Sequence, residues 1–259
     1  MVAISDLGIE ADEETIESLS DAVDNMEIAF AKWNADTDSF DGQTFLTDGG
    51  DAVVMNPTLA ADGGKITAIW AEAIDCDLLG FGGTYTVVSR TLENGAWGAP
   101  VELFTTDDYY AIVELAGGYH DGGLQVAFAA FSRDTGPDAT DVYARDSKPD
   151  IWLWRDGEIV PLADTKEASG LQFADGLFYW QAGGQVHRFD ISDSSWGPAL
   201  ADAAVSGSFK IVSGGGKTAL AWAEAGEDGN YCLKASILDG EVFWPACDTQ
   251  SYWRADLEL

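Results

Sequence analysis

The chain has little positive charge. Its 259 residues include 13 Lys and Arg against 45 Asp and Glu, so the formal net charge at pH 7 is −32. A surface of this sign repels the phosphates of nucleic acids and the headgroups of anionic lipids. The composition therefore argues against nucleic-acid binding and against electrostatic attachment to membranes. An excess of acidic residues is also typical of halophilic proteins, which is an alternative origin of the charge.

Long apolar runs and a leader sequence are missing too. No stretch of about 18 apolar residues is present, which excludes insertion into a bilayer. The first ten residues lack the basic start and apolar centre of a signal peptide, so we expect a fragment of a longer protein with neighbouring domains. The chain is nevertheless 46% hydrophobic and 12% aromatic, which predicts a packed core rather than disorder.

Cysteine is scarce, but two of the three cysteines have an informative spacing. Asp239-Gly240 separates two apolar runs and is a strong signal for a two-residue hairpin turn. If Leu238 faces Glu241, the strand register places Cys232 opposite Cys247, within disulfide reach. Such a bridge favours an exported protein. The alternative is a pair of small buried thiols that share a strand pair.

One ten-residue segment occurs twice. GKITAIWAEA at 64–73 aligns without a gap to GKTALAWAEA at 216–225, with six identities in ten. Weaker copies lie at 28–33, 124–131 and 177–180. The copies carry aromatic anchors at intervals of 37, 58, 52 and 42 residues: Trp33, Trp70, Phe128, Trp180 and Trp222. These intervals bracket the period of β-propeller blades, roughly 40 to 50 residues.

The same series of segments follows each apolar copy. An amphipathic strand, a tight turn and an edge strand, often with proline, come next, and a further strand leads into the following copy. The expected leading strands are 56–61, 110–115, 170–174 and 208–213. This unit is a four-stranded antiparallel sheet, and its radial repetition makes a propeller. The predicted fold is therefore an all-β propeller with about five repeats, complete or part of a larger ring.

Two regions do not fit the repeat. Residues 11–23 place Ile16, Leu19 and Val23 at helical spacing, which predicts a short helix in a lead-in spanning residues 1–25. The propeller domain would then span residues 26–259. Because the first copy is short, we expect residues 251–259 to supply its missing strand.

The repeat unit also supports a family resemblance. The pattern P-x-L-A-x-D-G, an apolar strand ending in Trp, and then D/N-G-x-W-x-x-P-x-x-L match best from Pro57 to Leu103. With these motifs, the chain resembles bacterial secreted and surface β-propellers with sialidase-like (BNR-like) repeats, over residues 26 to 250. The Asp-box spacing of true sialidases occurs only in degenerate form at 91–97, where Glu93 replaces the aspartate. The resemblance therefore implies a non-catalytic propeller.

The sequence offers few types of candidate catalytic residue. Sialidase chemistry needs clustered arginines around a substrate carboxylate, and no repeat places arginine at a matching position. Polysaccharide hydrolysis instead needs a pair of inward carboxylates. Glu72 and Glu224 occupy the same position of two copies and are the candidates for that pair, with a structural role as the alternative.

Two kinds of binding site are suggested by local sequence. Alternating oxygen-bearing residues resemble a calcium loop: Asn34, Asp36, Asp38 and Asp41. The alternative is a solvated acidic loop, and no other cofactor is expected. Exposed aromatic rings could stack on sugars, with Tyr109, Tyr110 and Trp253 as the candidates.

These observations together predict a non-catalytic β-propeller module of an exported or cell-surface bacterial protein. It would bind a glycan or a protein partner through loops on one face. Two alternatives stay open. One is a polysaccharide-active glycoside hydrolase with carboxylates around the central channel, and the other is a purely structural segment of a larger adhesin-like protein.

Overall fold

The computed structural model describes most of the chain in strands, turns and loops. The described residues are 1–6, 26–77, 80–133, 149–162, 168–198, 204–206, 208–214, 216–226, 231–238 and 242–246. Within these ranges there is no helix, and hence none that could cross a membrane. The helix predicted at 11–23 and the strand predicted at 251–259 both lie outside the described residues.

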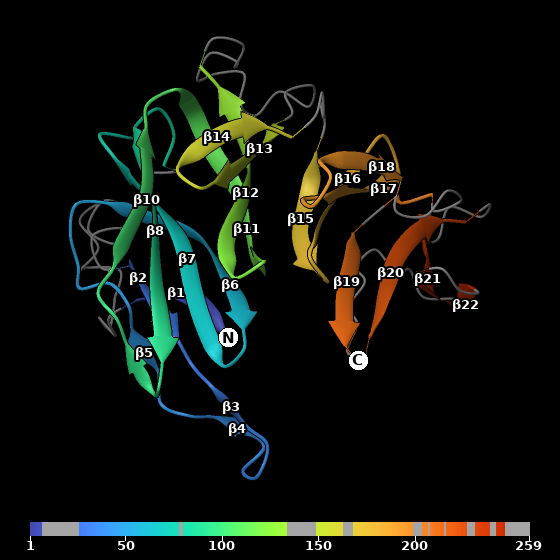
Figure 1. Cartoon of the computed structure of the whole chain (residues 1–259), viewed down its shortest axis with the longest axis horizontal. Helices are drawn as coiled ribbons and strands as arrows, with labels where there is room; N and C mark the ends of the chain where they lie inside the picture. The colour runs from blue at the N-terminus through green and yellow to red at the C-terminus, as the bar shows by residue number, and fades with distance from the viewer. Residues whose placement is uncertain are drawn as a thin grey trace, which may run out of the picture. The chain divides into compact units, whose positions relative to one another are not determined.

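The strands up to residue 106 form two sheets and a separate hairpin (Figure 1). The first sheet has the order β1-β2-β5, formed by β1 (Val2–Asp6), β2 (Met26–Phe30) and β5 (Thr44–Phe45). A separate hairpin pairs β3 (Trp33–Asn34) with β4 (Ser39–Phe40). The second sheet has the order β10-β8-β7-β6, and β9 also pairs with β8: β6 (Val53–Asp62), β7 (Lys65–Ile74), β8 (Thr84–Glu93), β9 (Ala96–Trp97) and β10 (Val101–Thr106).

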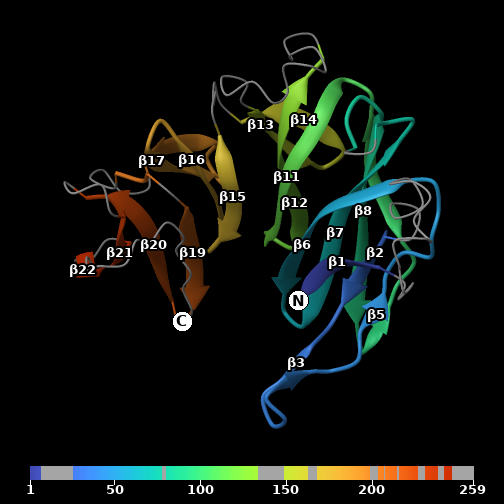
Figure 2. The ribbon, with the colours of Figure 1, turned by 180° about the vertical axis from the view of Figure 1, so that it is seen from behind.

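Three four-stranded sheets follow, each in consecutive strand order (Figure 2). The third sheet contains β11 (Tyr109–His120), β12 (Gly123–Ser132), β13 (Asp150–Arg155) and β14 (Glu158–Pro161). The fourth contains β15 (Ser169–Ala174), β16 (Leu177–Ala182), β17 (Gln185–Asp190) and β18 (Ser195–Pro198). The fifth contains β19 (Phe209–Gly214), β20 (Lys217–Ala225), β21 (Tyr231–Ile237) and β22 (Val242–Ala246). The predicted antiparallel four-stranded unit is thus confirmed, with each apolar copy as the second strand of its sheet.

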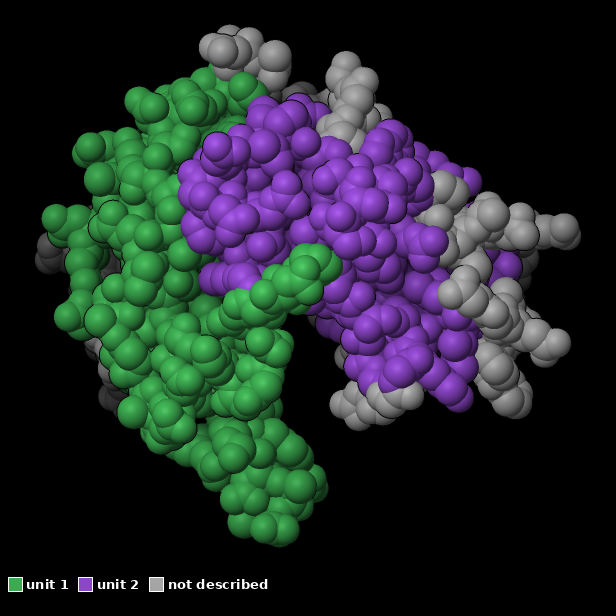
Figure 3. All heavy atoms as spheres, viewed as in Figure 1, with its two compact units in different colours: residues 1–122, 130–147 green, residues 123–129, 148–259 purple. Residues whose placement is uncertain are grey.

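The chain divides into two compact units, which Figure 3 shows in different colours. Unit 1 comprises residues 1–122 and 130–147, and unit 2 comprises residues 123–129 and 148–259. In unit 1, β1 pairs along its whole length with β2. Residues 2–6 therefore belong to the first sheet, where the sequence predicts a lead-in.

The tight turns explain why consecutive strands pair as they do. Asn94 and Gly95 both have positive φ, 53° and 79°, and so do Asp156 and Gly157, at 53° and 84°. Two successive positive φ values define the type I′ turn, whose twist matches that of the flanking strands. Asn or Asp followed by Gly adopts this conformation at the lowest steric cost. The short-range hairpin signals in the sequence are confirmed here.

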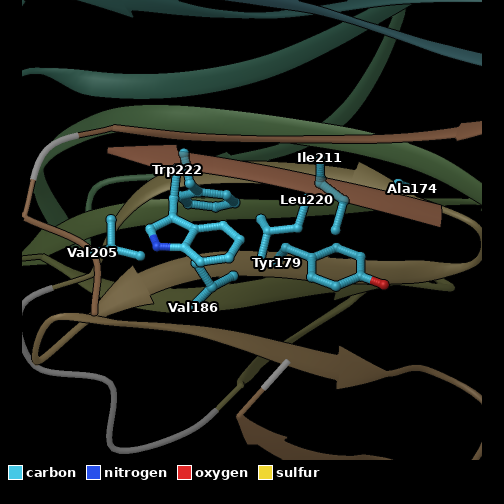
Figure 4. Close-up of a cluster of buried hydrophobic side chains, with 8 residues drawn as sticks. Ala174, Tyr179, Val186, Val205, Ile211, Leu220 and Trp222 are labelled. Atoms are coloured by element: carbon cyan, nitrogen blue, oxygen red, sulfur yellow. The ribbon is translucent and has the colours of Figure 1, made fainter. Parts of the chain in front are cut away.

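Each unit has a core between adjacent sheets. In unit 1, Ile28 and Phe30 of the first sheet pack against Trp70 and Val88 of the second. In unit 2, Trp222 of the fifth sheet is 2% exposed and packs in one cluster with Tyr179 of the fourth (Figure 4). A buried Trp removes a large apolar area from water, and truncating one to Ala costs about 3–5 kcal/mol. The repeated tryptophan therefore stabilises the contact between neighbouring sheets.

The first aromatic anchor is an exception. Trp33 is 48% exposed and contacts Phe40 edge-on, with 5.0 Å between the ring centroids. Both rings belong to the β3–β4 hairpin rather than to a core strand. Phe30, which is 8% exposed, fills the core position of the first sheet instead. The expectation that Trp33 is the anchor of the first repeat is wrong, because the apolar strand ends three residues earlier.

Candidate functional site

A pocket lies between the first and second sheets of unit 1. Its volume is about 310 Å³. Strand β2 contributes Glu27, strand β7 contributes Trp70 and Glu72, and strand β8 contributes Val88. Loops before β6 and β10 complete the walls. Residues of three strands and of two loops thus line the pocket together.

Carboxylates supply most of the polar lining. Glu27, Asp48, Glu72 and Glu102 all line the pocket, whereas no Lys, Arg, His or Cys does so among the described residues. A pocket of this kind cannot hold a substrate carboxylate as an arginine cluster would. It can accept hydrogen bonds from hydroxyl groups or attract a cation.

Glu27 is the most unusual of these carboxylates. Its side chain is 1% exposed, and neither carboxylate oxygen has a hydrogen-bond partner. Burying an unpaired polar group is costly, so buried carboxylates are normally paired or hydrogen-bonded. Gly49 lies beside it, and a Cβ built there would stand 3.5 Å from Glu27 Oε1, at ordinary van der Waals distance. Glu27 is among the residues that line the pocket, so its carboxylate is an unsatisfied polar group at this site.

Glu72 and Glu224, the predicted catalytic pair, have the same local geometry in different units. The indole Nε1 of Trp70 donates a 2.8 Å hydrogen bond to Glu72 Oε1, and that of Trp222 donates a 3.2 Å bond to Glu224 Oε2. Alternation along a strand places residues two apart on the same face, which explains the shared Trp-x-Glu contact. The two glutamates lie in separate units, so each is described within its own.

Glu224 carries a further partner. Lys234 Nζ lies 2.6 Å from Glu224 Oε1, and both side chains are mostly buried. Burial opposes ionisation of Glu224, but the hydrogen bonds from Lys234 and Trp222 outweigh it and lower the pKa of the carboxyl. Glu224 is therefore held as a structural ion pair, whereas Glu72 lines a pocket.

Hydrogen bonds between side chains and backbone hold the loops near the pocket. Arg90 donates from Nη1 to the carbonyl of Leu46 at 2.8 Å and from Nε to that of Gly98 at 2.6 Å. It thereby ties the loop after β5 to the loop before β10. The hydroxyl of Thr47 accepts a 2.9 Å hydrogen bond from the backbone N–H of Ile28. The carboxylates therefore stand on a framework held by hydrogen bonds.

The predicted stacking aromatics are not grouped at this pocket. Tyr109 is 5% exposed, and burial raises the pKa of its hydroxyl. The expectation that Tyr109 offers a surface for a sugar is wrong, because its ring has no free face. Tyr110 is partly buried and its ring stacks on Phe81, with 5.9 Å between the centroids. Trp253 lies outside the described residues.

The predicted calcium loop forms an acidic turn. The backbone N–H of Asp36 donates to Asn34 Oδ1 at 3.0 Å, and the Asn34 side-chain amide donates to Asp41 Oδ1 at 3.3 Å. Asp38 has φ of 50° at the turn. In the described part of the chain, no three acidic, His or Cys side chains gather as a metal site would require.

The cysteines differ in state. Cys232 is disulfide-bonded, and Cys76 is a free thiol whose pKa burial raises. Next to Cys232, Leu233 pairs with Ala246. This pair has the register that the sequence predicts for Cys232 and Cys247. Closer to the turn the register shifts by one residue at a β-bulge. The pairing of Cys232 with Cys247 stays a prediction, because Cys247 lies outside the described residues.

Glu27 is the site residue that the sequence pattern does not single out. It is a lone acidic residue at the second position of a short apolar strand, Met26–Phe30. A charged residue at a strand end is ordinarily solvated, so its type carries no signal. The only available hint is that it alternates with the apolar positions that form the core.

Comparisons with known proteins agree on the fold. No protein-family model and no curated protein sequence matches the chain. Among solved structures it is similar to TolB from Acinetobacter baumannii, with 14% identity and a TM-score of 0.52 over 93% of this chain and 51% of TolB. Trypanosoma rangeli sialidase gives 15% identity and a TM-score of 0.51 over 94% of this chain and 45% of the sialidase.

A third similar structure is the α-L-arabinanase of Penicillium chrysogenum, with 13% identity and a TM-score of 0.50 over 83% of this chain and 68% of that one. These neighbours are β-propeller proteins. Together with the repeated four-stranded antiparallel sheets, they define the class of this chain as a β-propeller with a sialidase-like fold. The chain spans about half the length of TolB, and identities this low concern the fold alone.

Proposed function

We propose that this chain is a non-catalytic β-propeller module of an exported or cell-surface bacterial protein, and that it binds a glycan or protein ligand in the acidic pocket of unit 1. The single observation that carries the proposal is the buried, unpartnered carboxylate of Glu27 in a pocket of about 310 Å³. A group that is costly to bury and lines a cavity is a signature of a binding site. The disulfide at Cys232 supports an exported location.

The test combines binding and turnover on purified protein. A glycan panel is screened by thermal shift and calorimetry, with release of reducing sugar measured in parallel. We expect at least one glycan to bind, with affinity reduced at least about tenfold in E27Q and E72Q, since hydrogen bonds to charged groups contribute about 1.5–3 kcal/mol. E224Q, which removes the equivalent carboxylate in unit 2, is the matched control and should bind like the wild type. Binding that is insensitive to both pocket variants would contradict the proposal.

A second candidate function is glycoside hydrolysis. It is favoured by the presence of Glu27 and Glu72 in one pocket, because such enzymes use two carboxyl groups around the scissile bond. Two solved neighbours are described as a sialidase and an arabinanase. Release of reducing sugar that is lost in both E27Q and E72Q would establish this activity in place of simple binding.

A further inference from the structure

The two copies of the Trp-x-Glu motif have different residues opposite the tryptophan. Trp222 pairs with Lys234, and Trp70 pairs with Val88 at the equivalent place. In unit 2, the lysine ammonium lies 2.6 Å from Glu224. In unit 1, valine has no charge to offer, and no described Lys or Arg pairs with Glu72. The copy in unit 1 thus has the Glu72 carboxylate but lacks a counterpart of Lys234.

The position in unit 1 that lacks a cation lies at the pocket. Glu72 and Val88 both line it, and Glu27 adds a second carboxylate that lacks any partner. From these observations we propose that the pocket binds an amino sugar of a glycan, whose ammonium group takes the place beside Glu72 that Lys234 Nζ takes beside Glu224. The proposal rests on the function proposed above and names the chemical group that is bound.

The charge and the size of the pocket both fit this ligand. Four acidic side chains line it without a basic one among the described residues, which favours a cation over a neutral or anionic group. A volume of about 310 Å³ is at the lower end of small-molecule sites. This volume exceeds that of one extended alkyl chain, so a sugar ring fills it better than a lysine side chain. Leu46, Val54 and Val88 provide apolar contacts for the C–H groups of that ring.

The test compares two ligands that differ in their amino groups. The full chain is titrated by calorimetry with glucosamine tetramer and with N-acetylglucosamine tetramer, at two salt concentrations. We expect the glucosamine tetramer to bind at least tenfold more tightly, because acetylation removes the ammonium charge. E72Q should weaken its binding at least tenfold. E224Q removes the same charge from the same motif in unit 2 and controls for general attraction to an acidic protein.

Val88→Lys gives a second, independent readout. The new lysine would copy Lys234 and pair with Glu72 within the chain, so it should reduce glucosamine binding at least tenfold. Val88→Met adds bulk without charge, and it should reduce glucosamine binding clearly less than Val88→Lys does. Near-ultraviolet circular dichroism and melting curves establish that each variant is folded.

The possible results separate the two proposals. Equal binding of both tetramers, or equal weakening by E72Q and E224Q, would overturn the amino-sugar inference. Binding of a neutral glycan, or of a lysine-containing peptide, in a Glu72-dependent manner would overturn it too, and would leave the pocket as a binding site. Failure of every glycan and peptide in the panel would contradict the proposed function itself.

Discussion

Replacement of Glu27 by methionine should stabilise the protein while removing its ligand. The side chain is 1% exposed and neither carboxylate oxygen has a hydrogen-bond partner, so the native state carries the full cost of desolvating it. An unsatisfied buried polar group costs about 1–3 kcal/mol, and a charged one costs more. Met has a similar length and no polar atoms. We therefore expect the free energy of unfolding to rise by about 2 kcal/mol.

The assay is denaturant unfolding followed by tryptophan fluorescence, together with melting curves. For a chain of this size, about 2 kcal/mol corresponds to a rise in Tm of roughly 4–8 °C. Glu224→Met is the matched control, and it should lower the stability, because it leaves Lys234 and the indole N–H of Trp222 without their partner. A loss of stability in E27M as large as that in E224M would contradict this expectation, because it would mean that the Glu27 carboxylate supports the fold.

Three further predictions concern the rest of the chain. Lys234→Met should lower the free energy of unfolding by about 1 kcal/mol at pH 7. Because Lys234 lowers the pKa of Glu224, this difference should shrink as the pH falls below about 4, where the unfolded carboxyl is protonated, and pH-dependent melts that show a constant difference would contradict the ion pair. Calcium and a chelator should give the same Tm, because the Asn34 amide already bonds to Asp41; a rise with calcium would revive a metal site. Thiol titration under denaturing, non-reducing conditions should give one free thiol, Cys76, and three would refute the bridge.

The fold could be predicted from the sequence because its signals are local and repeated. Asn94-Gly95 and Asp156-Gly157 require positive φ at both positions, and this requirement sets the turns that connect neighbouring strands. The apolar copies around Trp70 and Trp222 are long enough to predict buried strands, and their repetition implies sheets that pack on one another. Consistent signals at each level of structure make such a prediction possible.

The first sheet could not be predicted in the same way. Trp33 has the spacing of a repeat anchor, yet it lies on an exposed hairpin, since the apolar strand ends at Phe30. Strand β1 is supplied by residues 2–6, which carry no repeat motif. Where the repeat degenerates, spacing alone does not show which aromatic residue enters the core.

The candidate site could be predicted from the sequence only in part. Glu72 is marked by its repetition, but the sequence does not distinguish it from Glu224; their difference depends on the residues opposite them, Val88 and Lys234. Glu27 becomes informative only through its burial and lack of partners, which are properties of the three-dimensional contacts. Tyr109 is expected at the surface but is buried. An aromatic residue in a strand packs in the core as readily as it faces solvent, so its type alone does not decide between the two.

The decisive experiment on the pocket is a crystal structure of the full chain with the tightest-binding glycan of the panel. We expect the glycan to lie between β2 and β7, with a polar group within hydrogen-bond distance of Glu27 and another beside Glu72. A glycan seated elsewhere, for example on the exposed rings of Trp33 and Phe40, with the pocket left unfilled, would contradict it.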